Sequence, residues 1–136
     1  MLFWIAAAVV LAALGLGAWI RLAPSDPVRW HVDPVTAPDP ATPNFARVDR
    51  VVAMPMDRVA AAIAARAQAE GAVMLAGQGD HLTWLARTRW VGYPDYVSLR
   101  LLPADGGTRI VALSRSRFGH SDLGVNAERL DRWLPR

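Results

Sequence analysis

An uninterrupted apolar run near the start of the chain constrains the fold more than any other feature. Leu2 to Ile20 are 19 consecutive residues without a charged or strongly polar side chain. As a helix rising about 1.5 Å per residue, the run would be roughly 28 Å long, close to the hydrocarbon thickness of a bilayer. Trp4 and Trp19 lie near its ends, where indole rings prefer the membrane interface. We therefore expect residues 1–20 to form a single transmembrane anchor in the inner (cell) membrane.

A cleaved signal peptide is the main alternative for this run. No lysine or arginine precedes it, and it is longer than the roughly 7–15 residues of a usual signal core. The best small-residue cleavage site ends at Ala23, where the following Pro24 should obstruct cleavage. These features favour an uncleaved, single-pass anchor.

Proline dominates the next segment, since residues 21–44 hold six of the ten prolines. Each proline lacks an N–H donor and fixes φ, so we expect neither a helix nor a central strand here. The prediction is a semi-rigid extended spacer, reaching at most ~70 Å at about 3.1 Å per residue. Trp30 and His31 interrupt it, and would dock either on the following domain, as an ordered strap, or on the membrane interface.

Residues 45–136 carry the patterns of one α+β domain. They predict a strand over 45–54, a helix over 56–70, four strands over 72–76, 82–90, 97–101 and 108–117, and a final helix over 123–134. Connections of hairpin length, such as Asp105-Gly106-Gly107, favour a mostly antiparallel sheet with both helices on one face. The buried helix faces should be Val59, Ile63 and Ala67 in the first, and Leu123, Ala127, Leu130 and Leu134 in the last.

Charge and cysteine content exclude several classes of function. All 15 basic residues are arginine, and the formal net charge is only +3, too small for a dedicated nucleic-acid binder. The absence of cysteine excludes a disulfide scaffold, a thiol nucleophile and a thiolate zinc site. The three histidines lie in different segments without ligand spacing, and no glycine-rich phosphate loop follows a strand. We expect no metal and no cofactor.

A segment near the C-terminus carries a dense motif. Ser114-Arg115-Ser116-Arg117-Phe118-Gly119-His120-Ser121-Asp122-Leu123-Gly124-Val125-Asn126, followed by Arg129, closely resembles the signature of the bacterial and plastid family known as domain of unknown function 1499. Tyr93-Pro94-Asp95 resembles that family's aromatic-Pro-Asp-Asp turn, with Tyr96 in place of the second aspartate. The resemblance implies a domain exported by a signal peptide or membrane anchor, and thus a periplasmic location. Arg21 and Arg29 alone would instead favour the cytoplasm.

The motif first predicts a structural clasp. Ser121 or Asp122 should cap the last helix, and Asn126 should tie that helix to the preceding loop. His120, Ser121 and Asp122 are the residue types of a hydrolase triad, but adjacent residues cannot line up as a relay. We therefore assign no catalytic residue and expect no enzyme, with an unrecognised enzyme kept as a lesser alternative.

Arginine supplies the strongest binding signal. Arg87 and Arg89 share one face of a predicted strand, and Arg115 and Arg117 share one face of another. If those strands pair, four guanidinium groups would converge and could bind an anion or a lipid headgroup. Otherwise the arginines lie on a solvated face and pair with Asp95, Asp122 and Asp131. The candidate anion- or partner-binding residues are Arg87, Arg89, Arg115, Arg117, Asn126 and Arg129.

Two functions follow from these observations. The first is a non-enzymatic, membrane-anchored periplasmic domain that binds a membrane protein as an accessory or assembly subunit. The second is a lipid- or small-anion-binding module that uses an arginine-rich sheet face. The expected partners are the lipid bilayer and a membrane protein or complex, and no nucleic acid.

Overall fold

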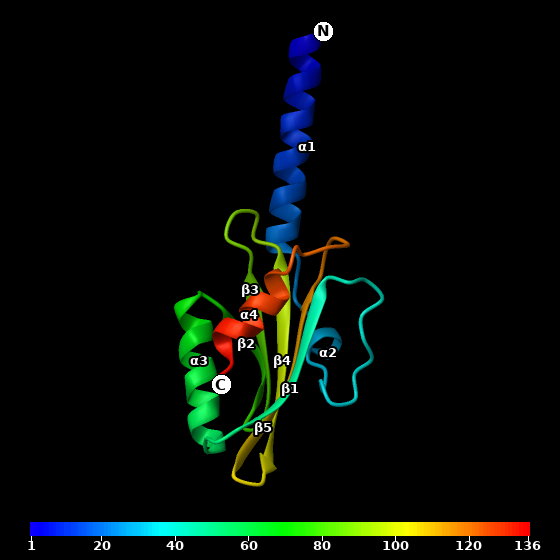
Figure 1. Cartoon of the computed structure of the whole chain (residues 1–136). Helices are drawn as coiled ribbons and strands as arrows, with labels where there is room; N and C mark the ends of the chain where they lie inside the picture. The colour runs from blue at the N-terminus through cyan, green and yellow to red at the C-terminus, as the bar shows by residue number, and fades with distance from the viewer.

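The computed structural model describes all of residues 1–136 and shows an N-terminal helix projecting from an α+β domain (Figure 1). The elements in order are α1 (Leu2–Leu22), α2 (Pro27–Trp30), β1 (Phe45–Val52), α3 (Met56–Ala69), β2 (Val73–Gln78), β3 (His81–Arg87), β4 (Pro94–Ala104), β5 (Gly107–Ser116) and α4 (Val125–Trp133). The predicted order of one strand, a helix, four strands and a helix after the apolar segment is confirmed. Helix α1 is long and apolar enough to cross a membrane.

The five strands form one antiparallel sheet in the order β1-β5-β4-β3-β2. A tight turn joins β4 to β5, and Gly106 adopts a φ of +77° there, a value that favours glycine. The sequence motif of an Asp-Gly hairpin thus sets the register in which Val97 faces Ser114. Strand β5 lies between β1 and β4, in agreement with its continuous apolar stretch, Ile110 to Leu113.

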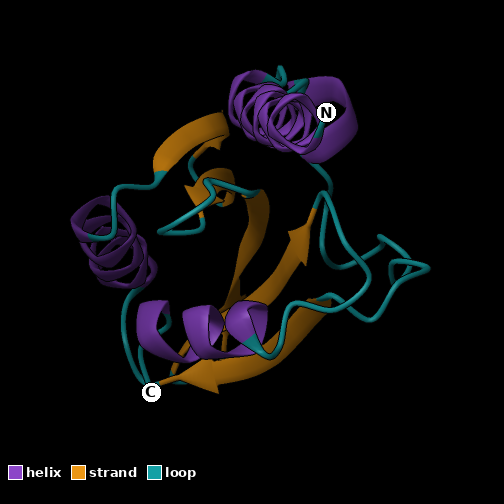
Figure 2. Cartoon of the chain, turned by 90° about the horizontal axis from the view of Figure 1, so that it is seen from above, coloured by secondary structure: helices purple, strands orange, loops and turns teal.

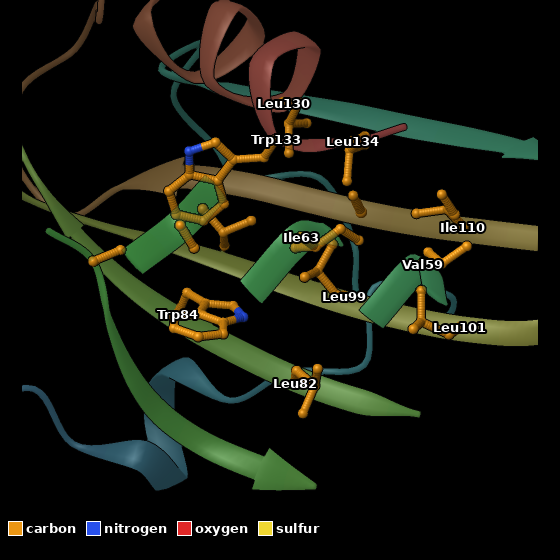
Figure 3. Packing of buried hydrophobic residues seen from close by; sticks show 14 of the residues in the cluster. Val59, Ile63, Leu82, Trp84, Leu99, Leu101, Ile110, Leu130, Trp133 and Leu134 are labelled. Atoms are coloured by element: carbon orange, nitrogen blue, oxygen red, sulfur yellow. The ribbon is translucent and has the colours of Figure 1, made fainter. Parts of the chain in front are cut away.

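Helices α3 and α4 cover one face of the sheet, as Figure 2 shows. Val59, Ile63 and Ala67 form the predicted stripe of α3 and are each no more than 1% exposed. They pack with alternate strand residues and the end of α4, as seen in Figure 3. The labelled strand residues of this core are Leu82, Trp84, Leu99, Leu101 and Ile110. Burial of each such side chain contributes about 1.5–3 kcal/mol.

The predicted buried face of the last helix is wrong in part. Leu123 precedes α4 and is 92% exposed, and Ala127 is also exposed. The buried face instead holds Asn126, Arg129, Leu130 and Trp133. The apolar spacing failed here because two polar residues occupy inward positions, where they find hydrogen-bond partners on the sheet.

Residues 23–44, which we call the strap, cover the opposite face of the sheet, so the alternative in which Trp30 docks on the domain is the one that the structure shows. The strap also contains the short helix α2, contrary to the expectation that its prolines exclude any helix. Pro27 occupies the first helical position, where a missing N–H is harmless, and the Asp26 carboxylate accepts from the Val28 N–H at 2.9 Å. Trp30 is buried and stacks on Tyr96 at a ring-centroid distance of 4.0 Å.

Polar contacts fasten both ends of the strap. Ser25 Oγ and Tyr96 Oη form a hydrogen bond of 2.8 Å at its beginning. Farther along, the guanidinium of Arg47 on β1 donates to the Pro34 carbonyl at 2.7 Å and to the Asp39 carboxylate at 2.5 Å. These contacts hold the segment that joins α1 to the sheet against the sheet face.

His31 of the strap contacts His81 of β3, which is distant in the sequence. The rings of His31 and His81 stack at 3.9 Å between centroids. His31 Nδ1 and Thr83 Oγ1 form a hydrogen bond of 2.8 Å, and His81 Nε2 donates to the Val32 carbonyl at 3.0 Å. The pKa of His31 is lowered from its ordinary value of 6.5, first by burial and then by the neighbouring His81.

Candidate functional site

The motif segment folds around Asn126, which is fully buried at the start of α4. Ser114 Oγ donates to its side-chain oxygen at 2.6 Å, and its amide nitrogen donates to Ser116 Oγ at 2.9 Å and to the Asn44 carbonyl at 3.1 Å. The amide also donates to the Asp122 carboxylate at 2.6 Å. Asn126 therefore links the last strand, the end of the strap, the loop and the last helix, and we call this set of contacts the clasp.

Asp122 and Ser121 lie in the loop that leads into α4. The Asp122 carboxylate accepts the backbone N–H of Asn126 at 2.8 Å and that of Gly124 at 3.2 Å, while Ser121 Oγ accepts from the Leu123 N–H at 3.3 Å. Burial raises the pKa of Asp122, but the hydrogen bonds that its carboxylate accepts, chiefly from Asn126 and also from Gly124, together outweigh burial, and the net pKa is lowered. The N-cap of α4 is Gly124, with φ at +87°, so neither Ser121 nor Asp122 occupies the predicted cap position, although Asp122 still accepts the first-turn N–H of Asn126.

Arg129 forms a buried ion pair with Asp95. Its Nη2 donates to Asp95 Oδ2 at 2.7 Å, and the two side chains are 4% and 1% exposed. Nη1 of the same guanidinium donates to Asn126 Oδ1 at 3.1 Å. The pair therefore joins the Tyr93-Pro94-Asp95 turn to the clasp, although the sequence suggested only a surface pairing for these two residues.

The predicted convergence of Arg87, Arg89, Arg115 and Arg117 does not occur. Strand β4 lies between β3 and β5, so the strands that carry the two pairs are not neighbours. Arg115 lies over the Trp30 ring at 4.8 Å, and Arg117 donates to the Pro24 carbonyl at 2.7 Å, so both hold the strap. Strand β3 ends at Arg87, which leaves Arg89 in the following loop.

The early end of β3 also corrects the predicted strand over 82–90, because Trp90 lies beyond the last strand residue, Arg87. Thr88 closes a turn by accepting the Gly92 N–H on its carbonyl at 3.0 Å and the Tyr93 N–H on its hydroxyl at 2.9 Å. Trp90 lies at the tip of this β3–β4 loop and is 83% exposed.

A groove nevertheless brings four arginines together, two of them from α4. Its volume is about 520 Å³, and Arg87 and Arg89 line it together with Arg129 and Arg132 of α4. We call it the arginine groove. Arg132 is paired with Glu70, whose carboxylate it contacts at 2.7 and 3.1 Å and which raises its pKa. Arg132 escaped the sequence analysis, although its position three residues after Arg129 places both on one side of a helix.

Arg87 and Arg89 have no carboxylate partner in the arginine groove. Arg87 donates to the Gly92 carbonyl at 3.0 Å, and Arg89 lies over the Trp90 ring at 5.3 Å. Both side chains belong to exposed residues. The groove thus contains two guanidinium groups whose charge is not balanced by a neighbouring acid.

The arginine groove is lined in part by the β3–β4 loop, which lies at the end of the domain from which α1 projects (Figure 1); we call this end the α1 end. Trp90 and Val91 share a hollow of about 360 Å³ with residues 13–21 of α1. Trp19 of α1 packs edge-on against Phe118 at 5.3 Å between ring centroids. The β3–β4 loop and the loop that precedes α4 therefore both lie beside the base of α1.

A second pocket, of about 280 Å³, lies at the α1 end beside the clasp. Asp95 and Asp122 line it, as do Ser116, Tyr93 and Phe118. Thr88 and Val125 line both this pocket and the arginine groove, so the two cavities adjoin. We call it the clasp pocket.

The fold and these contacts define an α+β domain built on a buried polar clasp and preceded by an apolar helix. The chain belongs to the family described as "Protein of unknown function (DUF1499)", whose model matches residues 22–136. The match includes the strap, which agrees with its packing on the sheet. No curated protein and no solved structure matches the chain.

Proposed function

We propose that this protein is a membrane-anchored, non-enzymatic domain that binds the phosphate groups of anionic lipids in the arginine groove. One observation carries the proposal: Trp90 lines both the arginine groove and the hollow against α1. The guanidinium groups therefore lie next to the one helix that is long and apolar enough to cross a membrane.

The depth of the loop supports contact with headgroups. A helix of the 21 residues of α1 is about 31 Å long at about 1.5 Å per residue, which matches a hydrocarbon core. If α1 spans the bilayer, the Trp90 loop lies beside its last turns, residues 13–21, and so reaches from the interface into the membrane. Tryptophan is a residue type enriched at the interface.

The charge of the groove fits a phosphodiester. Arg129 and Arg132 are neutralised by Asp95 and Glu70, whereas Arg87 and Arg89 are not. Guanidinium groups bind phosphate oxygens in a bidentate manner, and two of them suit a singly charged headgroup phosphate. Each arginine near an anionic membrane surface contributes about 1 kcal/mol.

Native mass spectrometry of the full-length chain in detergent with phosphatidylglycerol tests this proposal. The double variant Arg87→Gln/Arg89→Gln should weaken lipid binding roughly tenfold or more, since about 2 kcal/mol is removed. The matched control is Arg58→Gln/Arg136→Gln, which removes the same charge from two exposed residues outside the groove. Equal lipid binding by the groove variant and the control would refute the proposal.

A protein partner is the second candidate function, and the edge strand β2 favours it. Val73 and Met74 on this strand are 57% and 43% exposed, and one side of β2 has no strand neighbour. Such an edge can pair with an extended segment of another chain. Crosslinked purification from membranes would favour this role if crosslinks to one membrane protein map to β2, and would oppose it if they do not.

A further inference from the structure

One carboxylate oxygen of the clasp has no partner. Asp95 is 1% exposed, and its Oδ2 accepts from Arg129, while its Oδ1 has no hydrogen-bond partner. A buried carboxylate oxygen without a donor is costly, so a donor is expected at this position. Asp95 lines the clasp pocket, which is therefore the nearest cavity from which a donor would approach.

The charge of the clasp pocket is also unbalanced. The negative charge of Asp95 is matched by Arg129. Asp122 takes part in none of the ion pairs of the protein, and its carboxylate accepts only neutral N–H groups from Asn126 and Gly124. With its lowered pKa, Asp122 stays ionised at neutral pH. The pocket therefore holds one net negative charge.

We propose that the clasp pocket binds a primary ammonium group. Such a group supplies the positive charge that Asp122 lacks and donates N–H bonds to Asp95 Oδ1 and to the Ser116 hydroxyl. Tyr93 also lines the pocket, and an aromatic ring favours a cation through its electron-rich face, whereas the Phe118 ring already lies under the Arg117 guanidinium at 5.1 Å. The volume of about 280 Å³ is several times that of one water molecule, about 30 Å³, and accepts an aminoethyl group.

The clasp pocket differs from the arginine groove in the sign of its charge and in the ligand that it binds. The groove attracts anions through Arg87 and Arg89, whereas the clasp pocket attracts a cation through Asp95 and Asp122. Either site can therefore be present without the other.

Titration of the ¹⁵N-labelled full-length chain with ethanolammonium chloride, followed by NMR, tests the inference. We expect saturable shifts of the amide signals of Ser121 and Val125, which line the pocket. Choline is the matched probe, because it carries the same charge without an N–H donor, and it should bind at least fivefold more weakly. No saturable shift at the pocket, or equal binding of both probes, would overturn the inference.

Variants at the rim of the pocket keep the test independent of folding. Leu123 lines the pocket and is 92% exposed, so its replacement should leave the core intact. Leu123→Lys places a tethered ammonium at the rim and should weaken ethanolammonium binding at least fivefold, whereas Leu123→Gln should not. Asp122→Asn should also weaken it, with Asp131→Asn as its control on the exposed side of α4. Undiminished binding by Leu123→Lys would contradict the inference.

The ammonium can belong to a lipid headgroup or to a small soluble amine, and nanodiscs distinguish the two. In discs that contain phosphatidylethanolamine, a lipid ligand shifts the pocket signals before any amine is added and reduces the response to ethanolammonium. A soluble ligand leaves the signals alike in discs with and without this lipid, with equal ethanolammonium binding in both. Loss of ethanolammonium binding in both kinds of disc counts against the site itself.

Discussion

The contacts of Asn126 explain why so many polar residues lie close together in the motif near the C-terminus. A buried asparagine needs partners for both its amide nitrogen and its oxygen, and here β5, the end of the strap and the loop before α4 supply them. The residues of the motif are therefore coupled, because each loses its partner when another is removed. The same network brings the Asp95–Arg129 pair to the edge of the clasp pocket.

Asn126→Ala should lower the melting temperature of the full-length chain. It removes the acceptor of the buried Ser114 hydroxyl and one of the two donors to the Asn44 carbonyl, at a cost of about 1–3 kcal/mol. For a domain of about this size, each kcal/mol corresponds to roughly 4–8 °C. Gln68→Ala, which removes an exposed amide from α3, is the control and should leave the melting temperature nearly unchanged. If both variants melt like the wild type in a detergent melting curve, the clasp does not stabilise the domain.

At the scale of elements, the strap connects α1 to the sheet. The strap buries Trp30 and Ala23 and crosses the face that the helices leave open. A chain of hydroxyl contacts continues from His31 through Thr83 to Ser98, which donates to the Trp30 carbonyl at 3.4 Å. The strap is thus held both by apolar packing and by the hydrogen bond of His31, which depends on the protonation state of its ring.

Acidification should loosen the strap. The folded-state pKa of His31 lies below its ordinary value of 6.5, so the folded state prefers the neutral ring. The stabilisation from this group is complete above about pH 6.5 and is lost as the pH falls from there towards the folded-state pKa. The melting temperature should therefore fall between pH 7.5 and 5, and fall less in His31→Gln. His120→Gln, at an exposed position, should follow the wild type. Identical pH profiles for all three proteins would exclude this role of His31.

Local patterns predicted most elements, and tertiary partners explain the failures. Alternation and helical spacing depend on burial alone, so β5 and the Val59, Ile63 and Ala67 stripe were predictable. The inward positions of Asn126 and Arg129 were not, because their burial depends on partners that other segments supply. The position of the strap was not predictable either, because it depends on the contact between Trp30 and Tyr96, which lie far apart in the sequence.

The candidate site was predicted less completely than the fold. The motif identified Ser121 and Asp122, whose contacts are local, and also Asn126, although its contacts to Ser114 and Asn44 come from other segments. Strand order decides which arginines meet, and it cannot be derived from alternation. Arg115 and Arg117 therefore lie under the strap, while Arg87 and Arg89 meet Arg132 instead.

At the scale of the whole molecule, we propose that the domain faces the periplasm, as its family resemblance implies. Arg21 and Arg29 favour the opposite orientation by the positive-inside rule, although two arginines are a small count. Reporter fusions at Arg136 decide between the two. Alkaline phosphatase should be active there and green fluorescent protein dark, and the reverse pattern places the domain in the cytoplasm.

The central claim is that the α1 end lies on the bilayer and presents the arginine groove to lipid headgroups. The absence of native cysteine allows a single spin label at Val91→Cys, next to Trp90, with Asp105→Cys in the β4–β5 turn at the opposite end as the reference. The measurement is the accessibility of each label to oxygen and to a water-soluble nickel chelate, with the full-length chain in liposomes. The label at 91 should favour oxygen, as expected at the lipid interface, while the label at 105 should favour the chelate. A label at 91 as exposed to the chelate as the label at 105 would contradict the account.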